Sequence, residues 1–210
     1  MVSLISKIIS RQKYRAIVLW EMCRGLDFSR VANNIVTEVK EDSGNYFSSS
    51  ALFPEFKKAL KLLNISRVDS IYDFGVGKGA TLVAFSRFPF NRIGGCELSA
   101  ILVKIARRNL NTLGLLNVQI DEVDARLCFN LDCYNYFYFY NPFPRHVMCD
   151  VLNNILESAV RNPRKIRIIY CNPEHHESIV QNGGFVLLNV VKSNIGNQIV
   201  KIYEHDGCIK

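Results

Sequence analysis

The stretch Ile71-Tyr72-Asp73-Phe74-Gly75-Val76-Gly77-Lys78-Gly79-Ala80 is the part of the sequence that decides the fold. An apolar run ends in an aspartate, three alternate glycines follow, and Thr81-Leu82-Val83-Ala84-Phe85 starts a helical pattern. This order predicts a strand, a glycine loop and a helix that begins at about Lys78. Glycine permits a sharp turn and lets a ligand approach the backbone where a Cβ would collide. The start of the helix favours an anionic group, whereas Asp73 favours a ligand that also carries cationic groups.

The spacing Asp-x-Gly-x-Gly-x-Gly resembles motif I of the class I S-adenosylmethionine-dependent methyltransferases. The resemblance implies a cofactor loop whose candidate contacts are Asp73, Phe74, Gly75, Val76, Gly77 and Gly79. Two alternatives compete with it. Gly75-x-Gly77-x-x-Ala80 also satisfies the pattern of an NAD(P)-binding Rossmann protein, and any tight turn between a strand and a helix has a similar composition.

Length and composition are those of one domain with an appendage. A chain of 210 residues, 49% hydrophobic, can bury one substantial core. We expect an N-terminal helical cap over residues 1–44 and an S-adenosylmethionine-binding methyltransferase domain over residues 45–210. The seven cysteines form no Cys-x-x-Cys pair, which predicts reduced thiols, a cytoplasmic protein and no metal site.

The charge is basic overall and is concentrated in two places. The formal net charge is +7, and residues 1–40 hold seven Lys or Arg against three Asp or Glu. A second basic cluster consists of Arg161, Arg164, Lys165 and Arg167. Such clusters are compatible with nucleic acid, with a membrane surface or with an ordinary solvated face, and we favour the last.

Residues 1–23 alternate apolar pairs with basic residues, which predicts an amphipathic helix. Its uncharged runs are far shorter than the roughly 20 residues that a bilayer span needs. We favour a helix that caps the catalytic domain, while contact with a membrane surface or a partner remains possible. Residues 40–50 form a polar loop, and in methyltransferases such a loop ahead of motif I often covers the cofactor. Tyr46 is therefore a candidate contact. Pro54 then opens a helix.

The second strand is expected to end at Glu97, 24 residues after Asp73 and close to an offset of roughly 20. This offset is typical of an acidic residue that binds a ribose. The stretch from Gly94 to Ser99 resembles motif II of the methyltransferases, which implies that Glu97 binds both ribose hydroxyls and makes Leu98 a neighbouring contact. Ser99 is expected to cap the helix that follows.

The third strand, predicted over residues 117–124, also ends in an acid. By the same resemblance, Asp124 and Ala125 occupy the position that binds adenine, through a carboxylate and a backbone N–H. Either Asp121 or Asp124 could instead cap a turn, and the spacing favours Asp124 for the adenine role.

The aromatic run from Asn135 to Tyr140 predicts a central parallel strand buried on both faces. It ends in Asn141-Pro142-Phe143-Pro144, which resembles motif IV of the amine-methylating families. The resemblance implies that the Asn141 amide oxygen accepts a hydrogen bond from the target N–H, although the second proline is displaced relative to the family. A plain strand-to-helix turn is the alternative. His146 is a weak candidate for proton removal.

Residues 165–172 predict a fifth strand, and a short helix then starts at Pro173. Adjacent His175 and His176 would point about 100° apart on a helix, so they suit a polar surface better than one metal ion. Two terminal strands around residues 184–191 and 198–203 form a hairpin, which requires an antiparallel strand. The predicted fold class is α/β: a Rossmann-like class I methyltransferase fold, seven strands and mostly parallel, with helices on both faces. The details also resemble a small bacterial group with a strand-end Asn-Pro-Phe, distantly like the histone lysine methyltransferases that lack a SET domain.

Function follows from the resemblance: an S-adenosylmethionine-dependent methyltransferase with Asn141 as the residue that orients the acceptor. The acceptor is unidentified. An amine-type nitrogen is favoured, a protein amine, a glycan and a small molecule are possible, and nucleic acid is possible but not favoured. The alternatives are a cofactor-binding module without catalysis and an NAD(P)-binding protein.

Overall fold

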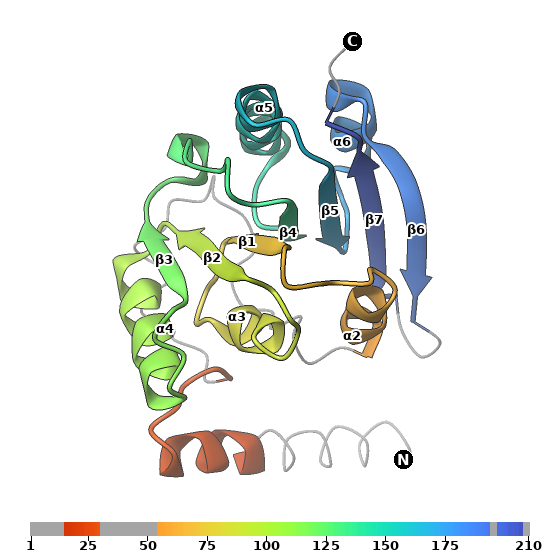
Figure 1. Cartoon of the computed structure of the whole chain (residues 1–210). Coiled ribbons are helices and arrows are strands. Elements are labelled where there is room, and N and C mark those ends of the chain that lie inside the picture. Colours follow the sequence, from red (N-terminus) through yellow and green to blue (C-terminus); the bar gives the residue numbers. More distant parts are fainter. Residues whose placement is uncertain (1–14, 30–53, 194–196, 208–210) are drawn as a thin grey trace.

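The computed structural model describes residues 15–29, 54–193 and 197–207, and it is built around one seven-stranded sheet (Figure 1). The strands in chain order are β1 Ser70–Phe74, β2 Arg92–Glu97, β3 Gln119–Glu122, β4 Tyr136–Tyr140, β5 Ile166–Cys171, β6 Val186–Lys192 and β7 Ile199–His205. Their order across the sheet is β3-β2-β1-β4-β5-β7-β6. The first five run parallel, and β7 pairs antiparallel with both β5 and β6. The predicted fold class, including the antiparallel terminal hairpin, is confirmed.

Helices cover both faces of this sheet. They are α2 Pro54–Lys61, α3 Ala80–Phe85, α4 Ala100–Thr112, the 3-10 turn η3 Ala125–Leu127, α5 Arg145–Arg161 and α6 His176–Gly183. Figure 1 shows α2, α3 and α4 on one face and α5 and α6 on the other. A further helix spans residues 15–23. Within the described ranges, none of the helices is long and apolar enough to cross a bilayer.

Strand β4 is the centre of the core. Tyr136 and Tyr138 pack with α2 and α3 on one face, while Phe137 and Phe139 pack with α5 on the other. All four side chains are buried. Burial on both faces explains the unbroken aromatic run, because a strand in the middle of a parallel sheet has no solvent-facing side.

The structure differs from the sequence prediction mainly at element ends. Strand β3 covers four residues, Gln119–Glu122, rather than residues 117–124. It lies at the edge of the sheet, where only one neighbouring strand supports it. Helix α6 begins at His176, three residues later than predicted, because Asn172 first takes a left-handed conformation (φ 47°) that ends the strand in a turn.

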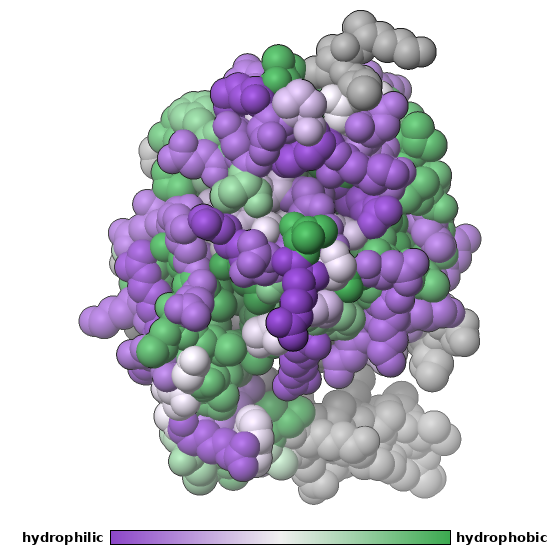
Figure 2. Space-filling view, viewed as in Figure 1, coloured by the Kyte–Doolittle hydropathy of each residue, from purple (hydrophilic) through white to green (hydrophobic). Residues whose placement is uncertain are grey.

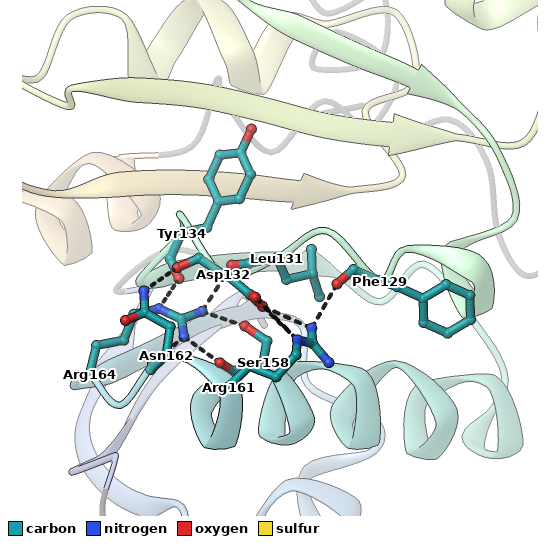
Figure 3. Close-up of polar contacts among 8 residues, drawn as sticks. All are labelled: Phe129, Leu131, Asp132, Tyr134, Ser158, Arg161, Asn162 and Arg164. Atoms are coloured by element: carbon teal, nitrogen blue, oxygen red, sulfur yellow. Dashed lines mark hydrogen bonds and ion pairs between the residues drawn. The ribbon is translucent and has the colours of Figure 1, made fainter.

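The residues of the second basic cluster make contacts within the fold, and Figure 3 shows those of Arg161 and Arg164. Arg161 makes an ion pair with Asp132 at 2.8 Å. Arg164 donates hydrogen bonds to the carbonyls of Leu131 and Tyr134 and to the hydroxyl of Ser158. These contacts tie the loop before β4 to the end of α5. Lys165 and Arg167 likewise pair with Glu204 on β7. Each basic residue of the cluster thus has a contact within the fold.

Residues 15–29 pack against α4 and the glycine loop. Leu26 and Asp27 are buried. The Asp27 N–H donates to Asn109 Oδ1 on α4 at 2.9 Å, and Asn109 Nδ2 donates to the carbonyls of Asp27 and Lys78, each at 3.0 Å. This part of the predicted cap therefore contacts the sheet domain. The boundary at residue 44 stays a prediction, since residues 30–53 lie outside the described ranges, and Tyr46 lies there with them.

Candidate functional site

The glycine loop lies at the carboxyl ends of β1 and β2, as predicted. Gly75, Gly77 and Gly79 have φ values of 86°, 53° and 84°, the left-handed region in which residues with a side chain are strained. A Cβ on Gly75 would lie 3.2 Å from Pro142 Cβ. The loop after β1 and the Asn-Pro turn after β4 are thus in direct contact, which brings the two most informative motifs of the sequence together.

The backbone N–H groups of this loop have partners within the protein. Those of Gly75 and Val76 donate to the Cys96 carbonyl at 2.9 and 3.0 Å, and that of Gly79 donates to the Val76 carbonyl at 2.8 Å. The Gly77 N–H donates to Glu97 Oε2 at 2.9 Å. A loop that cradles a phosphate aims such groups at the ligand. The observed pattern therefore disfavours a pyrophosphate here.

Close packing under the loop requires a glycine on β2. A Cβ on Gly95 would lie 2.5 Å from the Asp73 carbonyl oxygen and 3.1 Å from Asp73 Cβ. Any side chain at this position would push β2 away from β1. Phe74 and Val76, both predicted contacts, have side chains buried in the core.

Asp73 is buried at the end of β1. The Thr81 hydroxyl at the start of α3 donates a hydrogen bond to its Oδ2. Burial raises the pKa of Asp73 to about 7, the Thr81 hydrogen bond opposes this rise, and the nearby Glu97 charge adds to it. A buried carboxyl of this kind gains from a cationic partner, because a positive charge favours its ionised form.

Glu97 lies at the end of β2 and faces the loop. Its two oxygens accept from the Gly77 N–H and from the Ser99 N–H, at 2.9 and 3.0 Å. Desolvation raises its pKa, while these backbone donors act in the opposite direction. The orientation of the carboxylate is thus fixed by two backbone groups, and each oxygen has a second lone pair for another donor. Leu98 beside it is 53% exposed, which leaves an apolar surface next to the carboxylate.

Asp124 caps η3. Its Oδ1 accepts from the Arg126 N–H at 2.9 Å, and its Oδ2 pairs with the Arg126 guanidinium at 2.6 Å. The hydrogen bonds from Arg126 lower the pKa of Asp124. The turn-capping interpretation is therefore realised in the structure, and the adenine role of Asp124 and Ala125 stays a prediction. Asp121 accepts a hydrogen bond from the Tyr72 hydroxyl at 3.0 Å.

Two asparagines end β4 and β5 in the same way. Asn141 and Asn172 have positive φ values, 41° and 47°, and a proline follows each. The Tyr170 hydroxyl on β5 donates to Asn141 Oδ1 at 3.3 Å, and Asn172 Nδ2 donates to the Tyr140 hydroxyl on β4 at 2.8 Å. Each asparagine is therefore held by a tyrosine of the other strand, an arrangement that we call the tyrosine cross-brace.

The neighbours of Asn141 have different roles. Phe143 packs edge-on against Phe74 and Phe139, with ring centroids 6.4 and 6.2 Å apart, so it anchors the turn to the core. His146 is exposed near the start of α5, and the structure gives it no contact with Asn141. His176 makes a 2.7 Å hydrogen bond between its Nδ1 and the Tyr203 hydroxyl. No group of His, Cys, Asp and Glu in the described residues could hold a metal ion.

Sequence reasoning missed Lys78 and Asp27. Lys78 Nζ lies 2.7 Å from Asp27 Oδ1, and both side chains are buried. It missed the tyrosine cross-brace too. The repeated Asn-Pro dipeptide at residues 141–142 and 172–173 was a signal for the second asparagine, but nothing local in the sequence pairs either asparagine with its tyrosine.

The topology and the order of these motifs define a class I methyltransferase fold. A SAM-dependent O-methyltransferase from Thermotoga maritima matches 78% of this chain and 69% of its own, at 16% identity and a TM-score of 0.61. An RNA methyltransferase from Salinibacter ruber, solved with S-adenosyl-L-homocysteine, matches 72% of this chain and 88% of its own, at 17% identity and a TM-score of 0.53.

TrmN from Thermus thermophilus matches 70% of this chain at 17% identity and a TM-score of 0.55, but only 47% of TrmN is covered. No protein-family profile matches the chain, and no relative is found among curated proteins. At these identities the likeness shows the fold alone.

Proposed function

We propose that the protein transfers a methyl group from S-adenosylmethionine to a nucleophile held beside Asn141, with an amine-type nitrogen as the preferred acceptor. The observation that carries the proposal is the contact between the glycine loop after β1 and the Asn-Pro turn after β4. A Cβ on Gly75 would touch the Cβ of Pro142. This contact supports a cofactor site on the loop that adjoins an acceptor site at the Asn-Pro turn, and the fold is one shared with methyltransferases.

The residues around the loop fit this cofactor. Glu97 offers two oriented carboxylate oxygens for the ribose hydroxyls, and Leu98 offers an exposed apolar surface beside them. Asp73 is a buried carboxyl whose raised pKa would fall again beside the cationic part of the ligand. An NAD(P) pyrophosphate would find fewer hydrogen-bond donors, because four loop N–H groups already donate to partners inside the protein.

The acceptor side follows from Asn141. An amide oxygen has two lone pairs, and Tyr170 uses one of them. The second can accept a hydrogen bond from an N–H, which orients the nitrogen lone pair toward the methyl group. A carbon nucleophile has no such donor.

When bound, the cofactor supplies an activated methyl group on a sulfonium, so the protein's own task is alignment. The loop positions the ligand, Glu97 fixes its rotation, and Asn141 orients the nucleophile. The two left-handed asparagines hold this edge of the sheet in a defined shape.

Thermal unfolding tests the cofactor. S-adenosylhomocysteine at 100 times its Kd should stabilise the protein by about 2.7 kcal/mol, a readily measured rise in Tm. NAD at the same concentration should leave Tm unchanged. Stabilisation by NAD and none by S-adenosylhomocysteine would overturn the proposal.

The acceptor class is then found with radiolabelled S-adenosylmethionine and fractionated cell extract. Label is expected in protein amines, glycans or small molecules that carry nitrogen. Acid- and base-stable label excludes a methyl ester, and co-migration of the hydrolysed product with N-methylated standards marks an N-methyl group. Label released by mild base, or label in a C-methyl or ether product, would contradict the amine preference.

A further inference from the structure

The helix formed by residues 15–23 exposes its apolar side chains. Leu19 is 62% exposed and Trp20 is 52% exposed, and Ile17 and Met22 are exposed as well. These residues do not pack on the sheet domain, although they belong to a segment whose later part is firmly attached to it. In the space-filling view, green surface lies between purple atoms at the lower edge, where this helix is found in Figure 1 (Figure 2).

The acidic residues of the same segment are turned inward. Glu21 is buried and accepts hydrogen bonds from the N–H groups of Phe28 and Ser29 at 3.0 and 2.9 Å. Asp27 is buried in the ion pair with Lys78. Within residues 15–29, both carboxylates are thus used inside the structure.

Basic residues are left at the surface. Arg15 and Arg24 are exposed, and Arg108 on α4 lies beside the segment, 3.9 Å from Asp27 and more than half exposed. The Arg24 guanidinium lies over the Trp20 ring, 4.3 Å from its centroid. Among residues 15–29 and the neighbouring Arg108, the surface therefore combines exposed aliphatic and tryptophan side chains with exposed basic residues.

We propose that this face, the docking helix at residues 15–23, binds the surface of an anionic lipid bilayer. Charge complementarity selects the occupant. Exposed basic residues are attracted to acidic headgroups, while Trp and aliphatic side chains enter the interface between headgroups and acyl chains. A nucleic acid would use the charges but would leave Ile17, Leu19 and Met22 in water.

The chain offers its own probe, because Trp20 is its single tryptophan. Full-length protein is mixed with vesicles of phosphatidylcholine and phosphatidylserine at a ratio of 3:1, and with vesicles of phosphatidylcholine alone. Emission of Trp20 should shift to shorter wavelength with the anionic vesicles and be quenched by brominated acyl chains. The apparent affinity should fall at least tenfold when salt is raised, because the attraction between charges is screened.

Matched variants distinguish vesicle binding by this helix from non-specific binding by any exposed apolar side chain. Leu19→Gln should lower vesicle affinity about fivefold or more, whereas Val160→Gln should not change it. Val160 is similarly exposed, at 61%, but lies on α5 on the other face of the sheet. Arg15→Gln should weaken binding to anionic vesicles and leave the residual binding to neutral vesicles unchanged.

Other occupants give other results. A spectral shift with single-stranded RNA and none with vesicles would assign the face to nucleic acid. A shift that depends only on protein concentration would assign it to a second copy of the chain. Either result, or an emission spectrum that vesicles leave unchanged, overturns the proposal.

Discussion

The two halves of the sheet's carboxyl edge reach the same backbone shape by different means. After β1 the chain turns with left-handed glycines, and carboxylates beside them bond to backbone N–H groups and to a threonine. After β4 and β5 it turns with left-handed asparagines, and their amides bond to tyrosine hydroxyls of the neighbouring strand. Glycine conformations and backbone N–H groups thus shape the first half, whereas hydrogen bonds between side chains shape the second. Substitutions should affect folding and ligand binding in the first, and catalytic alignment in the second.

The largest expected effect on stability comes from the buried Asp73 carboxyl beside the glycine loop. Asp73 has its pKa raised to about 7 by burial, above its ordinary value of 3.8. Its contribution to stability is full below pH 4 and is lost as the pH rises through 7. The free energy of unfolding should therefore fall by at most about 1.4 kcal/mol per pH unit in this window.

Urea unfolding of wild type and Asp73→Asn between pH 4 and pH 8 measures this directly, because the amide variant should lack the slope. Asp124→Asn is the matched control. The pKa of Asp124 is lowered by Arg126, so its small contribution has the opposite sign and disappears as the pH falls. Identical slopes in wild type and Asp73→Asn would show that Asp73 is ionised throughout.

The next effect concerns the close approach of β1 and β2. Gly95→Ala places a Cβ against the Asp73 backbone and should cost about 3 kcal/mol of stability, at the upper end of overpacking. Gly77→Ala has nothing within 4 Å and should cost only about 1 kcal/mol, from its positive φ. Chemical denaturation of both variants gives the comparison. Equal losses would mean that strain, and not contact, sets the requirement for glycine.

Asn141→Ala addresses the second half. If Asn141 orients the acceptor, kcat should fall about 100-fold, comparable to the loss of one oriented catalytic donor, while the Kd of S-adenosylhomocysteine stays within about threefold. Single-turnover kinetics and calorimetry separate the two. Loss of cofactor binding in a normally folded variant would show that Asn141 binds the cofactor. The two turns would then not differ in role.

Glu97→Gln tests the first half of the edge, and its expected effect on ligand affinity is smaller. The variant keeps the shape of the side chain but removes its charge and one acceptor oxygen. Affinity for S-adenosylhomocysteine should fall about tenfold, since hydrogen bonds to charged groups contribute about 1.5–3 kcal/mol. Titration calorimetry at constant pH tests this, and Glu122→Gln on β3 is the control. An unchanged Kd would place Glu97 outside the ribose site.

The smallest effect isolates the tyrosine cross-brace. Tyr170→Phe removes the hydroxyl that holds Asn141 and keeps the buried ring, so kcat should fall about fivefold without a change in cofactor Kd. Tyr140→Phe removes the equivalent hydroxyl opposite Asn172 and should change kcat less than about twofold. The reverse order of these two effects would show that Asn172, and not Asn141, faces the acceptor.

The sequence predicted the first half of the edge far better than the second. Strand β2 ends at Glu97 and Ser99 caps α4, both as predicted, because alternation, glycine spacing and caps are local signals. The tyrosine cross-brace depends on two residues about 30 positions apart meeting across neighbouring strands, which no local pattern encodes. The same applies to the contact between Asp27 and Lys78.

That contact between Asp27 and Lys78 has a thermodynamic consequence. Lys78 belongs to the glycine loop. Its ammonium donates to Asp27 Oδ1, and its carbonyl accepts from Asn109 Nδ2, which also donates to the Asp27 carbonyl. The loop and the segment therefore share a hydrogen-bonded residue. If a ligand on the loop changes the affinity of the docking helix for a bilayer, binding to the bilayer must change the affinity for that ligand by the same factor, because linkage is reciprocal. Lys78 is therefore the residue through which the proposed bilayer surface and the glycine loop would be coupled.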